Sequence, residues 1–268
     1  MRPRHNKHAR DFRDGERTPT AGRGEWIYGR RPVLEVVRAG KRHLYEAVLP
    51  REGRDAPEMA ELRGALVERG VPFRVAERDE LDVLCEGGNH QGVAIRTGGF
   101  PYISIDQVIH DVEADPEALV LLLDHIEDPQ NVGSLLRTAD AAGVTAVLIP
   151  EDRAAGVTAA VVRASAGAAE HMRVAKVVNL VRAMQELKTC GVWLTGLDFG
   201  PDAKRHTAVD FKGRVGLVVG SEGRGLSRLV RENCDFIACL PMKGRVESLN
   251  AGVAGAITLY EIVRQRGG

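Results

Sequence analysis

From residue 119 to the C-terminus, short apolar runs alternate with segments that have helical periodicity. The apolar runs cover residues 119–124, 144–150, 191–197, 214–220 and 236–241, and the helical patterns cover 131–142, 156–164, 179–189, 226–233 and 248–264. Nearly continuous apolar strands between helices are typical of a parallel sheet that helices cover on both faces. We therefore expect an α/β domain over residues 119–268, with ligands bound at the carboxyl ends of its strands.

Residues 25–97 show the same alternation on a smaller scale. Helices are expected after Tyr28-Gly29, over 56–69 and over 79–85, and strands near 44–49 and 93–96. This pattern predicts a small α/β sandwich. The following residues, 98–118, contain five acids, two prolines and no Lys or Arg, which favours a linker between two domains.

The charge of the chain is balanced, with 37 basic and 37 acidic residues, so a nucleic acid would have to be bound by local patches. One such patch is residues 1–24, where seven Lys or Arg stand against three acids and almost no aliphatic residues. This composition predicts a flexible basic arm, which either touches phosphates or is simply disordered. It matches neither a secretory signal nor an organelle transit peptide.

Other classes of protein are disfavoured by what the sequence lacks. The longest apolar runs, such as 118–123, are far shorter than the ~18 residues that a membrane-spanning helix needs. The four cysteines form no C-x-x-C pair and the histidines do not cluster, which indicates neither a disulfide framework nor a metal site. We therefore expect a protein of the reducing cytoplasm that binds no membrane and no metal.

Polar residues follow the first strand of the C-terminal domain, in the segment 124–140. Asn131 can cap the next helix, and Gly133 lets another backbone or a ligand approach its first turn. Arg137 lies about one and a half turns into that helix, where it can reach a ligand at the helix N-terminus. The segment indicates either an anionic ligand or an ordinary surface arginine.

A second segment, 217–227, is an apolar strand followed by three glycines in six residues, which permit close backbone approach. Its order is not G-x-G-x-x-G, and Glu222 in the turn would repel a phosphate. An uncharged or positively charged ligand fits this turn better.

A third segment, 240–250, leads into a helix of small residues that allows tight packing. Ser248 is a plausible helix cap, and Asn250 stands two residues later. Simple capping is the alternative to a functional role for both residues.

In chain order, these segments contain N-x-G-x-x-x-R-T-A, V-G-S-E-G-x-G-L-S and L-P-M-x-G-x-V-x-S-L-N. Together they resemble the three motifs of the SpoU (TrmH) branch of the SPOUT methyltransferases, and the resemblance covers residues 119–268. Tyr28-Gly29 and His90-Gln91-Gly92 further resemble the ends of the small substrate-binding domain of bacterial 23S rRNA guanosine-2′-O-methyltransferases.

The resemblance implies transfer of a methyl group from S-adenosylmethionine to a ribose 2′-hydroxyl of RNA, in the first instance a guanosine of 23S rRNA. It also implies a trefoil knot in the C-terminal domain, an exception to the rule that chains do not thread loops, and a homodimer with the site at its interface. A tRNA substrate, or an rRNA methylation that confers antibiotic resistance, stays open. The cofactor would contact the chain near five residues, Thr195, Gly196, Gly220, Leu240 and Leu249.

The same resemblance names a catalytic set, Asn131, Arg137, Glu222, Ser248 and Asn250. In the family the arginine that matches Arg137 has been assigned as the proton acceptor, but an arginine side chain is effectively always charged. We therefore interpret Arg137 as a clamp for the adjacent RNA phosphate that also stabilises the developing alkoxide. Glu222 either positions the hydroxyl or accepts its proton, or it merely bonds amides of its own turn. His90 and Gln91 either read an RNA base edge or close a loop.

Two other functions are weaker interpretations. A nicotinamide-dependent oxidoreductase could hold its pyrophosphate at Gly220–Gly225, but no G-x-G-x-x-G follows the first strand and Asp198 precedes the glycine turn. An RNA-binding module without catalysis would not need the complete catalytic set.

Overall fold

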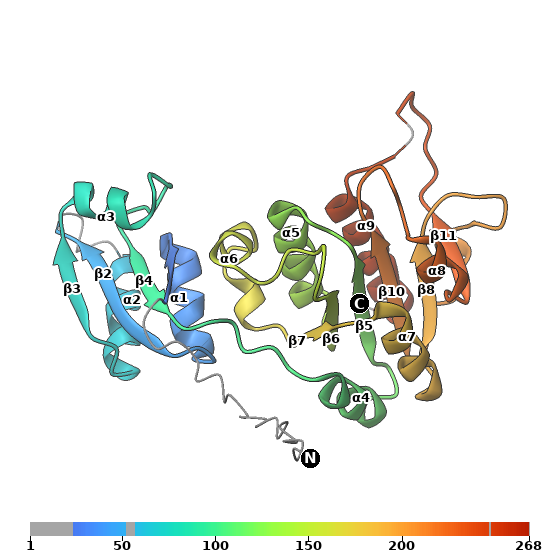
Figure 1. Cartoon of the computed structure of the whole chain (residues 1–268), viewed down its shortest axis with the longest axis horizontal. Coiled ribbons are helices and arrows are strands. Elements are labelled where there is room, and N and C mark those ends of the chain that lie inside the picture. The colour runs from blue at the N-terminus through green and yellow to red at the C-terminus, as the bar shows by residue number, and fades with distance from the viewer. Residues whose placement is uncertain (1–23, 52–56, 247, 268) are drawn as a thin grey trace, which may run out of the picture.

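The computed structural model describes residues 24–51, 57–246 and 248–267, so residues 1–23 of the expected basic arm lie outside the described residues. Its larger part is a seven-stranded sheet, on the right in Figure 1, with the order β7-β6-β5-β10-β8-β11-β9. The strands are β5 (Leu119–Asp124), β6 (Ala146–Pro150), β7 (Val174–Val177), β8 (Trp193–Leu197), β9 (Lys204–Arg205), β10 (Val215–Gly220) and β11 (Phe236–Cys239). All strand pairs in this sheet are parallel, which confirms the expected fold class.

Helices cover both faces of this sheet because both faces of its strands are apolar. One core joins Leu121 and Val219 of the strands to α5 (Pro129–Ala141), α6 (Ala159–Ala164) and α9 (Ala251–Gln265). A second core joins Leu122 and Val218 to α4 (Ile105–Ala114), α7 (Leu180–Thr189) and α8 (Arg228–Glu232). No helix in the described ranges combines the length and the apolar composition that a bilayer crossing requires.

The N-terminal part is a four-stranded sheet with the order β1-β4-β2-β3, on the left in Figure 1. Its elements are β1 (Glu25–Tyr28), α1 (Arg30–Ala39), β2 (Leu44–Pro50), α2 (Pro57–Glu68), β3 (Phe73–Ala76), α3 (Arg78–Leu84) and β4 (Ala94–Thr97). Strand β4 runs antiparallel to β1 and β2, whereas β2 and β3 are parallel. The side chains of α1 and α2 pack into one core with Ile27 and Leu49, and Leu81 of α3 packs with Val48 in another.

The expectation of a linker over residues 98–118 was wrong for about half of that segment, because α4 occupies its middle. Ser104 caps this helix in a reciprocal capping box with Gln107, which satisfies two backbone N–H groups. Val108 and Val112 are fully buried against the seven-stranded sheet. Of the five acidic residues that suggested a linker, Asp106, Asp111 and Glu113 lie on this helix and none of the three is buried.

The two sheets are joined by a buried ion-pair cluster. Arg42, in the loop between α1 and β2, donates from Nε to both carboxylate oxygens of Glu170 at 3.0 Å, and both side chains are fully buried. Arg42 also pairs with Glu25, whose other oxygen accepts a hydrogen bond from the backbone N–H of Ala159 at 2.9 Å. We call Glu25, Arg42 and Glu170 the joint. It ties β1 and the α1–β2 loop to the first turn of α6 and the η1 turn (Ala168–Glu170).

Candidate active site

The three polar segments of the C-terminal domain meet at one edge of the seven-stranded sheet. They follow β5, β10 and β11, three parallel strands whose carboxyl ends lie together. The segment after β5 forms the start of α5, the segment after β10 forms a glycine turn, and the segment after β11 leads into α9. Residues from distant parts of the chain therefore surround one place.

At this place Asn131, Glu222 and Asn250 form a hydrogen-bonded cluster. Asn131 Nδ2 donates to Glu222 Oε1 at 2.9 Å, and Asn250 Nδ2 donates to Asn131 Oδ1 at 2.7 Å and to the same Glu222 oxygen. The backbone N–H of Ala251, at the start of α9, lies 3.4 Å from that oxygen. Glu222 Oε1 thus faces three donors, and none of the described residues donates to its Oε2.

The helix caps differ from those that the sequence predicted. Asp128, not Asn131, caps α5 by accepting from the N–H of Gln130, and Asn131 lies inside the first turn with its side chain buried. Asn250, not Ser248, caps α9 by accepting from the N–H of Val253 at 3.1 Å. The Asn131 amide is therefore free of a capping role and holds Glu222 instead.

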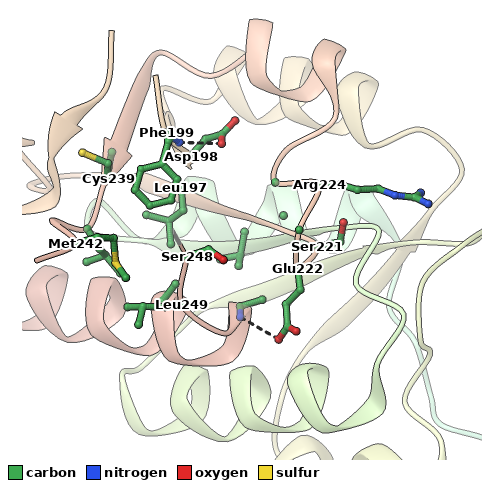
Figure 2. A pocket seen from close by; sticks show the side chains of 18 residues that line it. Leu197, Asp198, Phe199, Ser221, Glu222, Arg224, Cys239, Met242, Ser248 and Leu249 are labelled. Atoms are coloured by element: carbon green, nitrogen blue, oxygen red, sulfur yellow. Dashed lines mark hydrogen bonds between the residues drawn. The ribbon is translucent and has the colours of Figure 1, made fainter. Parts of the chain in front are cut away.

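A cavity of about 350 Å³ opens beside this cluster. Figure 2 shows Met242, Leu249 and Leu197 on one side of it and Glu222 on the other. Of the five residues expected at the cofactor, Gly220, Leu240 and Leu249 line the cavity, as does Ser248. The remaining lining residues are mainly small or apolar. Its charged side chains are the carboxylates of Asp198 and Glu222 and the guanidinium of Arg224.

Thr195 and Gly196 do not line this cavity because they lie within the body of β8. A Cβ atom on Gly196 would approach Leu226 to 2.5 Å and Cys234 to 2.8 Å, so this glycine makes room for the residues just before and just after α8. The end of the same strand, Leu197, with Asp198 and Phe199 after it, lines the cavity instead. The sequence feature that could have indicated this is Asp198, an acidic residue directly after an apolar strand and two residues beyond Gly196.

The glycine turn folds back tightly on its own strand. A Cβ atom on Gly220 would lie 2.2 Å from the carbonyl oxygen of Gly225, and that residue has a φ of +63°. The N–H of Gly225 bonds to the carbonyl of Ser221 at 3.0 Å. A side chain at position 220 would therefore displace the turn that carries Glu222.

An arginine of α8 holds the loop after β8. Arg231 pairs with Asp198 at 3.2 Å and with Asp202 at 2.6 Å. Its hydrogen bonds lower the pKa of Asp202, so this carboxylate stays ionised at more acidic pH than an ordinary aspartate does. The rim of the cavity at Asp198–Phe199 is thus fixed from outside.

Arg137 lies apart from the cavity of its own chain. It is exposed on α5, and no hydrogen bond or ion pair engages it among the described residues. Gly133 on the same helix allows α6 to approach closely, because a Cβ atom there would lie 2.4 Å from that of Ala164. Gly133 therefore permits close packing of α5 against α6.

The two residues expected to read RNA differ in exposure. His90 is buried; its Nε2 lies 3.0 Å from Asp82, and its Nδ1 accepts from the N–H of Gly92 at 3.0 Å. This geometry favours the loop-closing role for His90. Gln91 is exposed, and its Oε1 accepts from the N–H of Arg30 at 3.0 Å.

Comparison with known proteins identifies the family. The model of the SpoU rRNA Methylase family matches residues 118–260, and the model for RNA 2′-O ribose methyltransferase substrate binding matches residues 26–102. The 23S rRNA (guanosine-2′-O-)-methyltransferase RlmB of Xanthomonas campestris is 42% identical over 243 residues, which cover 90% of this chain and 97% of that one. An uncharacterized tRNA/rRNA methyltransferase of Mycobacterium ulcerans is 41% identical over 272 residues, 99% of this chain and 86% of that one.

Among solved structures, the SpoU methyltransferase AviRb from Streptomyces viridochromogenes in complex with AdoMet superposes with a TM-score of 0.74 and 26% identity. The match covers 90% of each chain. The family models, the relatives and this structure agree with the motifs that meet at the Asn131–Glu222–Asn250 cluster. The chain belongs to the SpoU rRNA methylase family.

Proposed function

We propose that this protein transfers a methyl group from S-adenosylmethionine to the ribose 2′-hydroxyl of a guanosine in 23S rRNA. The observation that carries the proposal is the Glu222 carboxylate, held by Asn131, Asn250 and the start of α9 at the wall of a cavity. The RlmB relative is named for this reaction, and the AviRb structure contains the cofactor.

The cavity suits the cofactor in its chemistry. Gly220, Leu240 and Leu249 present backbone groups and apolar surface to it, as an adenosine requires. At its wall the two carboxylates of Asp198 and Glu222 outnumber the one guanidinium of Arg224, which favours a cationic sulfonium over a phosphate. This arrangement supports the methyltransferase over a nicotinamide-dependent oxidoreductase, whose pyrophosphate would meet Glu222 in the glycine turn.

In the proposed mechanism, Glu222 positions the ribose hydroxyl and Arg137 stabilises the negative charge that develops on it. Bound S-adenosylmethionine supplies an electrophilic methyl group. Glu222, anchored through Oε1, offers Oε2 to the ribose hydroxyl, orients its oxygen for in-line attack and accepts its proton as the methyl group is transferred. Arg137 contacts the phosphate beside that ribose and stabilises the negative charge that develops on the 2′-oxygen. Ser248 lines the same cavity as Glu222.

We also propose a homodimer that completes the site, because Arg137 does not line the cavity of its own chain. Helix α9 packs on α5 and exposes an apolar stripe of Val253, Ile257 and Tyr260. A second copy that covers this stripe would bring its own Arg137 to the reacting ribose.

Mixing two inactive variants tests the shared site. Arg137→Ala and Glu222→Gln should each be inactive alone, and a refolded mixture should recover part of the wild-type rate, since one site of each mixed dimer is intact. Ile257→Asp should give a monomer in sedimentation, whereas Leu229→Asp, exposed on α8, should stay dimeric. An active monomer, or a mixture without recovery, would refute the dimer.

The finer architecture is also a proposal. We place RNA selection in residues 25–97 and the chemistry in residues 119–268, supported by the ranges that the two family models match. We propose that the loops after β10 and β11 form part of a trefoil knot, since both line the cavity although β8 separates their strands. Because the proposed substrate is rRNA, we propose that the protein acts in the cytoplasm.

Mapping 2′-O-methylation in total RNA of a deletion strain tests the function. We expect one guanosine of 23S rRNA to lose its methyl group and to regain it from a plasmid copy. Loss from a tRNA alone would establish the tRNA alternative, and resistance to a ribosome-targeting antibiotic that disappears with the methyl group would establish a resistance enzyme.

A further inference from the structure

A second cavity, of about 480 Å³, lies on the other side of the glycine turn. Its floor is the end of β5, and its walls come from the start of α5, the loop after β6 and the glycine turn. Ser221, Glu222, Arg224 and Gly225 line both cavities, so this turn is the partition between them. A group bound here lies next to the carboxylate that we assign to the ribose hydroxyl.

Three charged side chains on this cavity have no partner among the described residues. Glu127 makes no hydrogen bond or ion pair there, and the same is true of Arg153 and Arg224, although all three are exposed and line the cavity. On the nearby helix α8 the arginines are paired, Arg228 with Glu232 at 2.7 Å and Arg231 with Asp198 at 3.2 Å. The cavity therefore offers both acceptors and donors that the protein itself does not use.

A fourth group is oriented by the floor of the cavity. Asp124 is buried, accepts from the N–H of Ser227 at 2.6 Å and lies 2.5 Å from Nδ1 of His125. In the tautomer that donates Nδ1–H to Asp124, Nε2 is an acceptor. His125 has a φ of +56°, a left-handed conformation that is costly for a residue with a side chain. The structure thus holds His125 at the cavity at the expense of backbone strain.

The charges of the cavity exclude one kind of RNA group and favour another. Its carboxylates, Asp124, Glu127, Asp128 and Glu222, outnumber its guanidinium groups, Arg153 and Arg224, so an anionic phosphate is disfavoured. A neutral group with hydrogen-bond donors fits better. Among the four RNA bases, only guanine presents two adjacent donors, N1–H and N2–H2, that a carboxylate can accept together.

We propose that this second cavity binds the guanine base of the target nucleotide. Glu127 accepts from N1–H and N2–H2, and Arg153 donates to O6, the acceptor that arginine commonly recognises on guanine. The partition then places the ribose of that nucleotide between the base cavity and the cofactor cavity. This inference rests on the proposed function and adds the residues that make it specific for guanosine.

Single-turnover methylation of 23S rRNA fragments tests the assignment, with the target guanosine replaced by inosine, which lacks only the N2 amino group. For the wild type we expect inosine to lower kcat/KM about 10-fold. Glu127→Gln should lower the rate on guanosine by a similar factor and abolish the difference between the two nucleosides. Arg153→Ala should lower both rates equally, because both bases keep O6.

Two controls separate base recognition from folding. Glu151→Gln removes an exposed carboxylate of the loop after β6, which also carries Arg153. Because Glu151 does not line the cavity, this variant should behave as wild type. S-adenosylmethionine affinity, measured by calorimetry without RNA, should be the same in all variants. Equal wild-type rates on guanosine and inosine, or discrimination that survives in Glu127→Gln, would overturn the inference and leave the proposed function intact. If the wild type methylates no guanosine of 23S rRNA, the proposed function itself fails.

Discussion

The two sheets of this protein share one pattern of alternating strands and helices, but they use it differently. In the seven-stranded sheet every pairing is parallel, and polar loops gather at the carboxyl ends of β5, β10 and β11. In the four-stranded sheet β4 runs antiparallel, and the edge strand β3 leaves Phe73 and Val75 exposed. The parallel sheet thus gathers its polar loops at one edge, whereas the mixed sheet leaves apolar side chains exposed on an edge strand.

The largest expected effect is on the free energy of unfolding, from a substitution in the joint that connects the two sheets. Arg42→Ala would leave Glu170 buried without its partner and should lower the free energy of unfolding by about 3–5 kcal/mol. Burial raises the pKa of Glu170, so in the variant this penalty should shrink as pH falls and the carboxyl group takes up a proton. Urea unfolding at several pH values measures both effects.

The matched control is Arg38→Ala, which removes exposed ion pairs of α1 with Glu35 and Glu61. It should cost less than about 1 kcal/mol. If the two variants unfold alike, the joint contributes no more than a surface ion pair.

Substitutions of Arg137 test whether methyl transfer depends on residues of the seven-stranded domain. Arg137→Ala should lower methyl transfer by on the order of 10²-fold or more and leave cofactor affinity within a few-fold. Arg137→Lys keeps the charge without the planar fork and should be partly active. Single-turnover rates measure this.

The pH profile separates charge stabilisation from proton transfer at this residue. If the side chain at position 137 were the base, the rate of the lysine variant would rise steeply with pH, because lysine loses its proton more easily than arginine. We expect parallel pH profiles instead. Wild-type rates in Arg137→Ala would falsify any catalytic role for this arginine.

Substitutions in the domain of the four-stranded sheet should change the KM for RNA and leave the affinity for the cofactor unchanged. His90→Ala removes the ring that bonds to Asp82 and to the N–H of Gly92, so the loop loosens, and we expect KM for RNA to rise about 5-fold. Gln91→Ala, which leaves that ring in place, should have a smaller effect on KM. A fall in cofactor affinity in a folded His90→Ala protein would contradict this division between the sheets.

The smallest expected effect lies within α9. Hydrogen bonds from Arg264 and Gln265 lower the pKa of Glu261 from 4.5 to about 2. A carboxyl group with a lowered pKa in the folded state contributes stability above its unfolded pKa and loses it as pH falls toward the folded value. Because Arg264 is exposed, Glu261→Gln should cost only about 1 kcal/mol at pH 7.

Acid titration of stability measures that last effect. Between pH 4.5 and 2, the stability of the variant should change less than that of the wild type. Parallel curves would show that the contacts of Glu261 add nothing to folding.

The sequence predicted the sheet better than the site. Strands such as β5 were predictable because burial on both faces makes them continuously apolar, but α4 was missed because its exposed acids mask the buried Val108 and Val112. Asn131 and Glu222 are 91 residues apart, so their hydrogen bond follows from the order of the strands and not from any local spacing. Only the resemblance grouped them beforehand.

The glycine turn between the two cavities has a thermodynamic consequence. Because Glu222 and Gly225 line both, a ligand on one side that shifts the turn changes the binding free energy on the other. Such coupling is reciprocal: the factor by which S-adenosylmethionine changes RNA affinity equals the factor by which RNA changes cofactor affinity. With the cofactor and the guanine base in these two cavities, as we propose, the turn links their binding free energies as well as separating the cavities.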